Sequence, residues 1–121
     1  MSSHLQNLLN SFRTLSSVEL AAVVAPDGLL IESLAEAEHD VDAICAVASN
    51  SLVLAEALGR EIAKGEPRQM VLEYGEGLVI IEPMSSDALL LILANSRDDL
   101  GYLRFLVAKH RVAILEALSA I

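Results

Sequence analysis

The distribution of apolar and polar residues along the chain predicts one domain, covering residues 1–121, in which helices enclose a sheet. In sequence the pattern indicates a helix, two strands, a long helix, three strands and a last helix. In the first segment apolar residues such as Leu5 and Phe12 recur at helical spacing, and Ser2 or Ser3 can cap that helix. A helix with one apolar side covers another element with that side.

The first two predicted strands form a hairpin. Residues 18–25 (VELAAVVA) are apolar on both faces apart from Glu19, which predicts a central strand covered on both sides. Residues 26–28 (Pro-Asp-Gly) supply the turn, because Pro fixes φ and Gly accepts the left-handed conformation. Residues 29–34 then pair back as the second strand.

The longest predicted helix covers residues 40–64. Asp40 is its expected N-cap, Gly65 its expected left-handed C-cap, and Pro67 prevents its continuation. Its apolar residues cover roughly half of the circumference, which is more than one sheet face requires. The surplus is expected on a flank of small residues where a second helix can pack: Cys45, Ala48, Leu52, Ala55 and Gly59. The opposite, polar stripe contains Asp42, Ser49, Glu56, Arg60 and Lys64.

Three strands are predicted after this helix. Residues 68–74 alternate between apolar and polar positions, as an edge strand does. Residues 78–82 form the next strand, and Pro83 is expected to stop its pairing. Residues 88–94 (ALLLILA) are apolar throughout and predict a second central strand.

The last helix is predicted to begin at residues 98–101 (Asp-Asp-Leu-Gly) and to extend to Ile121. Arg97, Arg104 and Arg111 recur every seven residues and therefore lie on one side of it. This row has two interpretations, a solvated basic face on an acidic protein or an anchor for an acidic partner. The first interpretation is favoured from the sequence.

Composition narrows the classes of function. The net charge of −9, from 17 acidic and 8 basic side chains, repels nucleic-acid phosphate and anionic membranes. The chain is 54% hydrophobic with only 3% aromatic residues, so apolar surface is expected to be buried against another chain. A single cysteine, Cys45, fits a reducing cytoplasm. Because no long uninterrupted apolar run is present, no membrane span is expected.

Candidate chemical sites have simpler explanations. The acidic connector between the second strand and the long helix could form a metal site, but it lacks the ligand register and the glycine of a cation loop. A solvated connector with a capping Asp explains the same residues. The candidate ligands are Glu36, Glu38, His39, Asp40 and Asp42. Cys45 could pair with a histidine (His4, His39 or His110) as a catalytic dyad, but on an apolar side it is expected to be a small hydrophobe. No phosphate-binding glycine motif is present. We expect no catalytic residue, no metal and no cofactor.

Several motifs together resemble the Roadblock/dynein-light-chain family, in particular its bacterial MglB-like Roadblock domains. They are the hairpin VVAPDGLLIES at residues 23–33, the Ala-rich middle helix and DDLGYLR at residues 98–104. The resemblance implies an α/β (α+β), profilin-like fold of order αββαβββα. It implies a five-stranded antiparallel sheet with the long helix on one face and both terminal helices on the other.

The resemblance also implies a function. Members of the family form homodimers or heterodimers and regulate or scaffold small Ras-like GTPases, in some cases stimulating GTP hydrolysis, without catalytic residues of their own. The implied dimer, with edge strands paired and middle helices side by side, would use Cys45, Ala48, Leu52, Ala55, Gly59, Arg68, Met70 and Leu72. The GTPase would contact Asp42, Ser49, Val53, Glu56 and Arg60. The alternatives are a small-ligand sensory domain and a purely structural assembly dimer.

Overall fold

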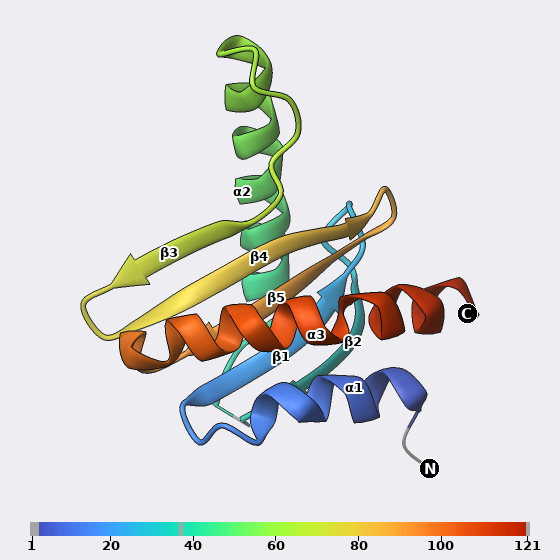
Figure 1. Cartoon of the computed structure of the whole chain (residues 1–121), viewed down its shortest axis with the longest axis vertical. Helices are drawn as coiled ribbons and strands as arrows, with labels where there is room; N and C mark the ends of the chain where they lie inside the picture. Colours follow the sequence, from blue (N-terminus) through green and yellow to red (C-terminus); the bar gives the residue numbers. More distant parts are fainter. Residues whose placement is uncertain (1–2, 37, 121) are drawn as a thin grey trace.

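The computed structural model describes residues 3–36 and 38–120. Figure 1 shows a sheet with helices on both faces. The elements are α1 (His4–Arg13), β1 (Val18–Val24), β2 (Leu30–Ala35), α2 (Val41–Glu61), β3 (Met70–Tyr74), β4 (Gly77–Ser85), β5 (Ala88–Ala94), the 3₁₀ turn η1 (Arg97–Asp99) and α3 (Leu100–Ser119). The antiparallel strands lie in the order β2-β1-β5-β4-β3, which makes β2 and β3 the edges. The predicted fold class and element order are confirmed.

The sheet separates two apolar cores. Helices α1 and α3 cover one face, where Phe12 and Leu103 are fully buried, and α2 lies behind the other face (Figure 1). Strand β1 serves both cores, because Ala21 belongs to the first and Leu20 to the second. This alternation explains why β1 is apolar on both sides. The predicted last residue of the final helix, Ile121, lies outside the described residues.

The predicted N-caps at Ser3 and Asp40 are confirmed. The Ser3 hydroxyl accepts a hydrogen bond from the Gln6 N–H at 3.0 Å and caps α1. Ser2, the alternative cap, lies outside the described residues. The Asp40 carboxylate accepts from the Ala43 N–H at 3.2 Å and caps α2. Each cap satisfies an N–H group that the first helical turn leaves unpaired.

The predicted C-cap of α2 at Gly65 is wrong, because the helix ends earlier, at Glu61. Ala63 adopts the left-handed conformation with φ of 55°, and the Lys64 N–H donates to the Gly59 carbonyl at 2.9 Å, as in a Schellman motif. The chain then folds back so closely that a Cβ at Gly59 would lie 2.3 Å from the Gly65 carbonyl oxygen. The glycine at position 59 therefore serves a turn within this chain.

The prediction that Pro83 stops the pairing of its strand is also wrong. Pro83 lies within β4 and faces Leu89 of β5. Its carbonyl accepts a hydrogen bond from Arg111 at 3.0 Å, so this backbone edge points away from β5. On that side β3 begins only at Met70, opposite Ile81. Because no strand among residues 3–36 and 38–120 lies beside Pro83 there, its missing N–H removes no ladder bond.

Helix α2 extends beyond the sheet. Figure 1 shows its second half standing clear of the strands, with the chain returning beside it to β3. By length and composition alone this 21-residue helix would suffice to cross a membrane, because an 18-residue stretch of it has a mean hydropathy of 1.5. The expectation from the sequence differed because it considered only uninterrupted apolar runs. Cys45 and Ala48 hold the first half against the sheet, so the uncovered apolar surface lies mainly in the second half.

Candidate functional site

One side of α2 exposes large apolar side chains to solvent. Val47, Leu54 and Leu58 recur at helical spacing and are 65%, 71% and 61% exposed. Ile62, just beyond the last helical residue, is also exposed and follows the same spacing. A contiguous apolar stripe of this kind indicates a surface that another molecule covers.

The stripe continues into an apolar hollow between α2 and β3. The hollow has a volume of about 330 Å³. Its lining includes Ala43, Val47, Leu72, Tyr74, Val79 and Leu91. Val47 belongs to both features, and β3 is an edge strand that pairs with β4. We call the stripe of Val47, Leu54, Leu58 and Ile62, together with this hollow, the α2–β3 surface.

The small-residue flank of α2 does not have the predicted exposure. Cys45 and Ala48 are buried in the core beneath α2, and Leu52 packs partly against the same core. Ala55 and Gly59 are half-buried. The expectation that Cys45 and Ala48 lie on a surplus edge is therefore wrong, because this flank faces the chain's own sheet. The exposed stripe lies further around the helix.

The three edge-strand residues that were predicted for the dimer interface have different surroundings. Met70 is half-buried and packs against the core beneath α2. Leu72 lines the hollow. Arg68 is exposed and precedes β3, which begins two residues later than predicted. Pairing of β3 with a second subunit stays a prediction.

Ser49, expected among the exposed partner contacts, is buried. Its hydroxyl donates to the Pro26 carbonyl at 2.5 Å, across 23 positions of the sequence. A buried hydroxyl satisfied by a backbone carbonyl stabilises the local packing and is not free to contact a partner. Ser49 therefore fixes the first hairpin turn to α2.

The other expected partner contacts are more accessible. Asp42, Val53 and Arg60 are exposed, and Glu56 is half-buried. Val53 and Glu56 share a small hollow of about 110 Å³ with Ser49, next to the two hairpin turns. The structure thus brings part of the predicted set together on one side of α2. Docking of a GTPase there stays a prediction.

The setting of Cys45 matches a structural thiol. Burial raises the pKa of the Cys45 thiol above its ordinary value of 9.0, and the nearby Asp42 carboxylate raises it further. A thiol with a raised pKa carries little thiolate near neutral pH and is a poor nucleophile. This agrees with the expectation that Cys45 acts as a small hydrophobe.

We expect native Cys45 to react with a thiol reagent such as DTNB roughly 100-fold or more slowly than the unfolded chain, because reaction requires local opening. As the only cysteine, it reports directly in absorbance. The raised pKa of the Cys45 thiol also makes the free energy of unfolding depend on pH. The contribution of the thiol is fully present below pH 9.0, its ordinary pKa, and is lost as pH rises through the folded-state pKa. Equal labelling rates in native buffer and in urea would contradict the buried thiol.

Two of the proposed connector ligands come together with a residue that the sequence did not place there. Ligand atoms of Glu19, Glu36 and His39 all lie within 4.8 Å of one another. The His39 Nε2 atom is 3.4 Å from a Glu19 carboxylate oxygen, so the two side chains face each other. Asp40 acts as the helix cap instead. The signal for Glu19 was its position as the one polar residue in a central strand.

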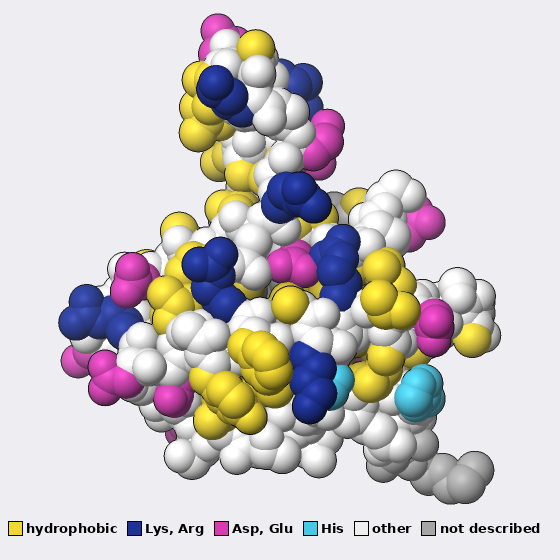
Figure 2. Space-filling model, viewed as in Figure 1, with side chains coloured by type: hydrophobic (Ala, Val, Ile, Leu, Met, Phe, Trp, Pro, Cys, Tyr) yellow, Lys and Arg dark blue, Asp and Glu magenta, His cyan; other side chains and the backbone are white. Residues whose placement is uncertain are grey.

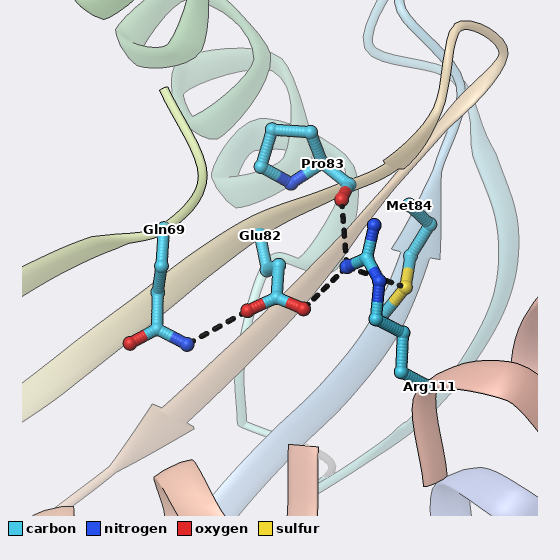
Figure 3. A network of polar contacts seen from close by, with 5 residues as sticks. All are labelled: Gln69, Glu82, Pro83, Met84 and Arg111. Atoms are coloured by element: carbon cyan, nitrogen blue, oxygen red, sulfur yellow. Dashed lines mark hydrogen bonds and ion pairs between the residues drawn. The ribbon is translucent and has the colours of Figure 1, made fainter. Parts of the chain in front are cut away.

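A polar network joins α3 to the sheet (Figure 3). Glu82 of β4 is only 7% exposed. Its carboxylate accepts from Gln69 Nε2 at 2.7 Å and from Arg111 Nη1 at 2.5 Å, and the same Nη1 donates to the Pro83 carbonyl. This pair was not predicted from the sequence, where a solvated Arg111 was favoured. The available signal was an acidic residue inside an otherwise apolar strand.

The layered sheet, with its uncovered α2–β3 surface, defines a small α/β domain with helices on both faces of an antiparallel sheet. Residues 4–94 match the Roadblock/LC7 domain family, and the chain belongs to this family. The resemblance drawn from the sequence motifs is confirmed.

Solved structures with the same fold include MglB from Myxococcus xanthus, with a TM-score of 0.87, 14% identity, and coverage of 97% of this chain and 96% of that one. The gliding protein MglB from Thermus thermophilus has a TM-score of 0.87, 11% identity and coverage of 98% and 90%. A Roadblock/LC7 domain from Streptomyces avermitilis has a TM-score of 0.72, 24% identity and coverage of 89% and 95%. At these identities the likeness concerns the fold. A comparison with curated protein sequences gave no match.

Proposed function

We propose that this protein is a homodimeric regulator or scaffold of a small Ras-like GTPase, without catalysis of its own. The observation that supports the proposed dimer is the α2–β3 surface, which is apolar, continuous and uncovered in the single chain. In a two-fold arrangement the β3 edges pair and the α2 helices lie side by side. Each α2 then covers part of the apolar hollow of the other subunit.

The exposed apolar side chains of this surface supply enough driving force for a dimer. Burying a Leu or Val side chain contributes about 1.5–3 kcal/mol. Val47, Leu54 and Leu58 occur twice in a symmetric dimer. Their combined burial is of the size needed to offset the loss of translational and rotational freedom, about 4–15 kcal/mol.

The family relationship supports a GTPase as the partner. A dimer through α2 places the outer sides of two helices next to each other and forms one composite surface. Asp42, Val53 and Arg60 are exposed on this outer side. Their mixture of charged and apolar groups suits a reversible protein contact at the rim of an interface. A heterodimer with a paralogue would present a related composite surface.

The test is a pull-down from native lysate with a GTP analogue or with GDP, read by mass spectrometry. We expect a Ras-like GTPase to be enriched in one nucleotide state. Val53→Asp is expected to lose at least about 80% of this GTPase while remaining dimeric, because a charge replaces an apolar contact. Val112→Asp is the matched control and should retain it, because Val112 on α3 is also exposed, at 65% against 53% for Val53.

The outcomes separate the two forms of the proposal. A GTPase bound in one state supports a regulator and leads to a turnover assay. A GTPase bound equally in both states supports a scaffold. An intact dimer that recovers no GTPase under either condition would contradict the proposed partner.

A further inference from the structure

A second surface feature lies beside α3, on the sheet face opposite the one that α2 covers. A groove of about 700 Å³ separates α3 from β4 and from the segment that enters β3. Arg68, Arg104 and Arg111 line it together with Phe105, and the buried Glu82 lies among them. Figure 2 shows basic side chains gathered around an acidic one on this face. None of the lining residues belongs to α2.

The charge of the groove is opposite to that of the protein. The whole chain carries a net charge of −9, with eight basic residues, yet three of its arginines converge here from α3 and from the β3 approach. Glu82 neutralises Arg111. Arg68 and Arg104 form no ion pair within residues 3–36 and 38–120. The groove therefore retains two uncompensated positive charges.

An exposed aromatic pair adjoins these charges. The rings of Tyr102 and Phe105 stack with centroids 6.1 Å apart and an interplanar angle of 23°. Both side chains are more than half exposed, in a chain with only two Tyr and two Phe. Phe105 lines the groove. Aromatic side chains next to arginines are typical of the residues that contribute most to protein interfaces.

We propose that this groove binds an acidic peptide segment of a partner protein. Carboxylates of the peptide pair with Arg68 and Arg104, and one apolar side chain packs against Phe105. A compact inorganic anion fits less well, because it would lie among the same groups as the Glu82 carboxylate.

The proposal goes beyond the proposed function, since it concerns the groove beside α3 and a different partner chemistry. Arg68 also stands in the predicted dimer interface, so Arg104 is the residue to change first. Because Arg104 is exposed and unpaired among the described residues, Arg104→Glu should fold normally. Lys109→Glu is the matched control, as it makes the same charge change on α3 outside the groove lining.

The experiment is a selection of random displayed peptides on the full chain, followed by fluorescence anisotropy with the enriched peptides. We expect enriched peptides to carry several Asp or Glu residues around an apolar residue. Arg104→Glu and Phe105→Ser should each weaken their binding by about tenfold or more, and Lys109→Glu by less than about threefold. Circular dichroism and sedimentation confirm that each variant is folded and keeps the oligomeric state of the unmodified chain.

Three results would overturn the proposal. The first is a selection that yields no acidic bias, or peptides that bind Arg104→Glu as tightly as the unmodified chain. The second is self-association beyond a dimer that Arg104→Glu abolishes, which would assign the groove to a second copy of this chain. The third is binding to phosphatidylglycerol vesicles with the same dependence on Arg104, which would assign it to a membrane surface.

Discussion

Replacing Leu54 with Asp is expected to convert the proposed dimer into a monomer at micromolar concentration. Leu54 is 71% exposed in the single chain, and its burial in a dimer contributes about 1.5–3 kcal/mol. Two-fold symmetry doubles this loss, which weakens association by roughly 100- to 10,000-fold at about 1.4 kcal/mol per tenfold change. Sedimentation equilibrium over a concentration series measures the dissociation constant directly.

The matched control is Val112→Asp on α3. Val112 is 65% exposed and lies outside the α2–β3 surface, so this variant should dimerise like the unmodified chain. Leu72→Asp, at the β3 side of the hollow, should act in the same direction as Leu54→Asp. If Leu54→Asp and Val112→Asp show the same dissociation constant as the unmodified chain, α2 does not lie in the dimer interface.

Much of the fold could be predicted because its signals are local. Strands β1 and β5 are apolar on both faces, which only an internal strand of a covered sheet requires. The turn at Gly28, with φ of 89°, follows from the Pro-Asp-Gly sequence, and the cap at Asp40 from its position before an apolar-periodic segment. Each of these features depends on residues within a few positions of one another.

The orientation of α2 could not be predicted in the same way. Apolar residues cover about half of the helix, so periodicity alone does not decide which part faces the sheet. The structure places the small residues Cys45 and Ala48 against the strands, which allows a close approach, and leaves the larger Val47 and Leu54 outside. The choice depends on the shape of the sheet surface and not on the hydrophobicity of the helix.

Polar contacts between distant segments also could not be predicted from the sequence pattern. The Ser49 hydroxyl donates to the Pro26 carbonyl, 23 positions away, and the Arg111 guanidinium donates to the Glu82 carboxylate, 29 positions away. Neither partner is marked by spacing, because the contact exists only after the hairpins and helices pack. For this reason Ser49 and Arg111 were expected to be solvated.

The second large effect is expected from Arg111→Met. This change leaves the buried Glu82 carboxylate with Gln69 as its remaining donor. Losing one partner of a buried ion pair costs about 3–5 kcal/mol. The Arg111 side chain is 38% exposed, and solvent screening reduces the expected loss of unfolding free energy to about 1–3 kcal/mol. Urea unfolding followed by circular dichroism, at one fixed protein concentration, measures it.

A double-mutant cycle separates the ion pair from simple packing. Glu82→Gln alone should cost less than Arg111→Met, because the uncompensated guanidinium that remains is partly solvated. In the double variant the neutral amide needs no counter-charge, so much of the stability lost in Arg111→Met should return. Arg104→Met, on the same helix without an ion pair among the described residues, is the control and should change stability by less than about 0.5 kcal/mol. Equal destabilisation by Arg111→Met and Arg104→Met would show that the contact with Glu82 contributes nothing to the fold.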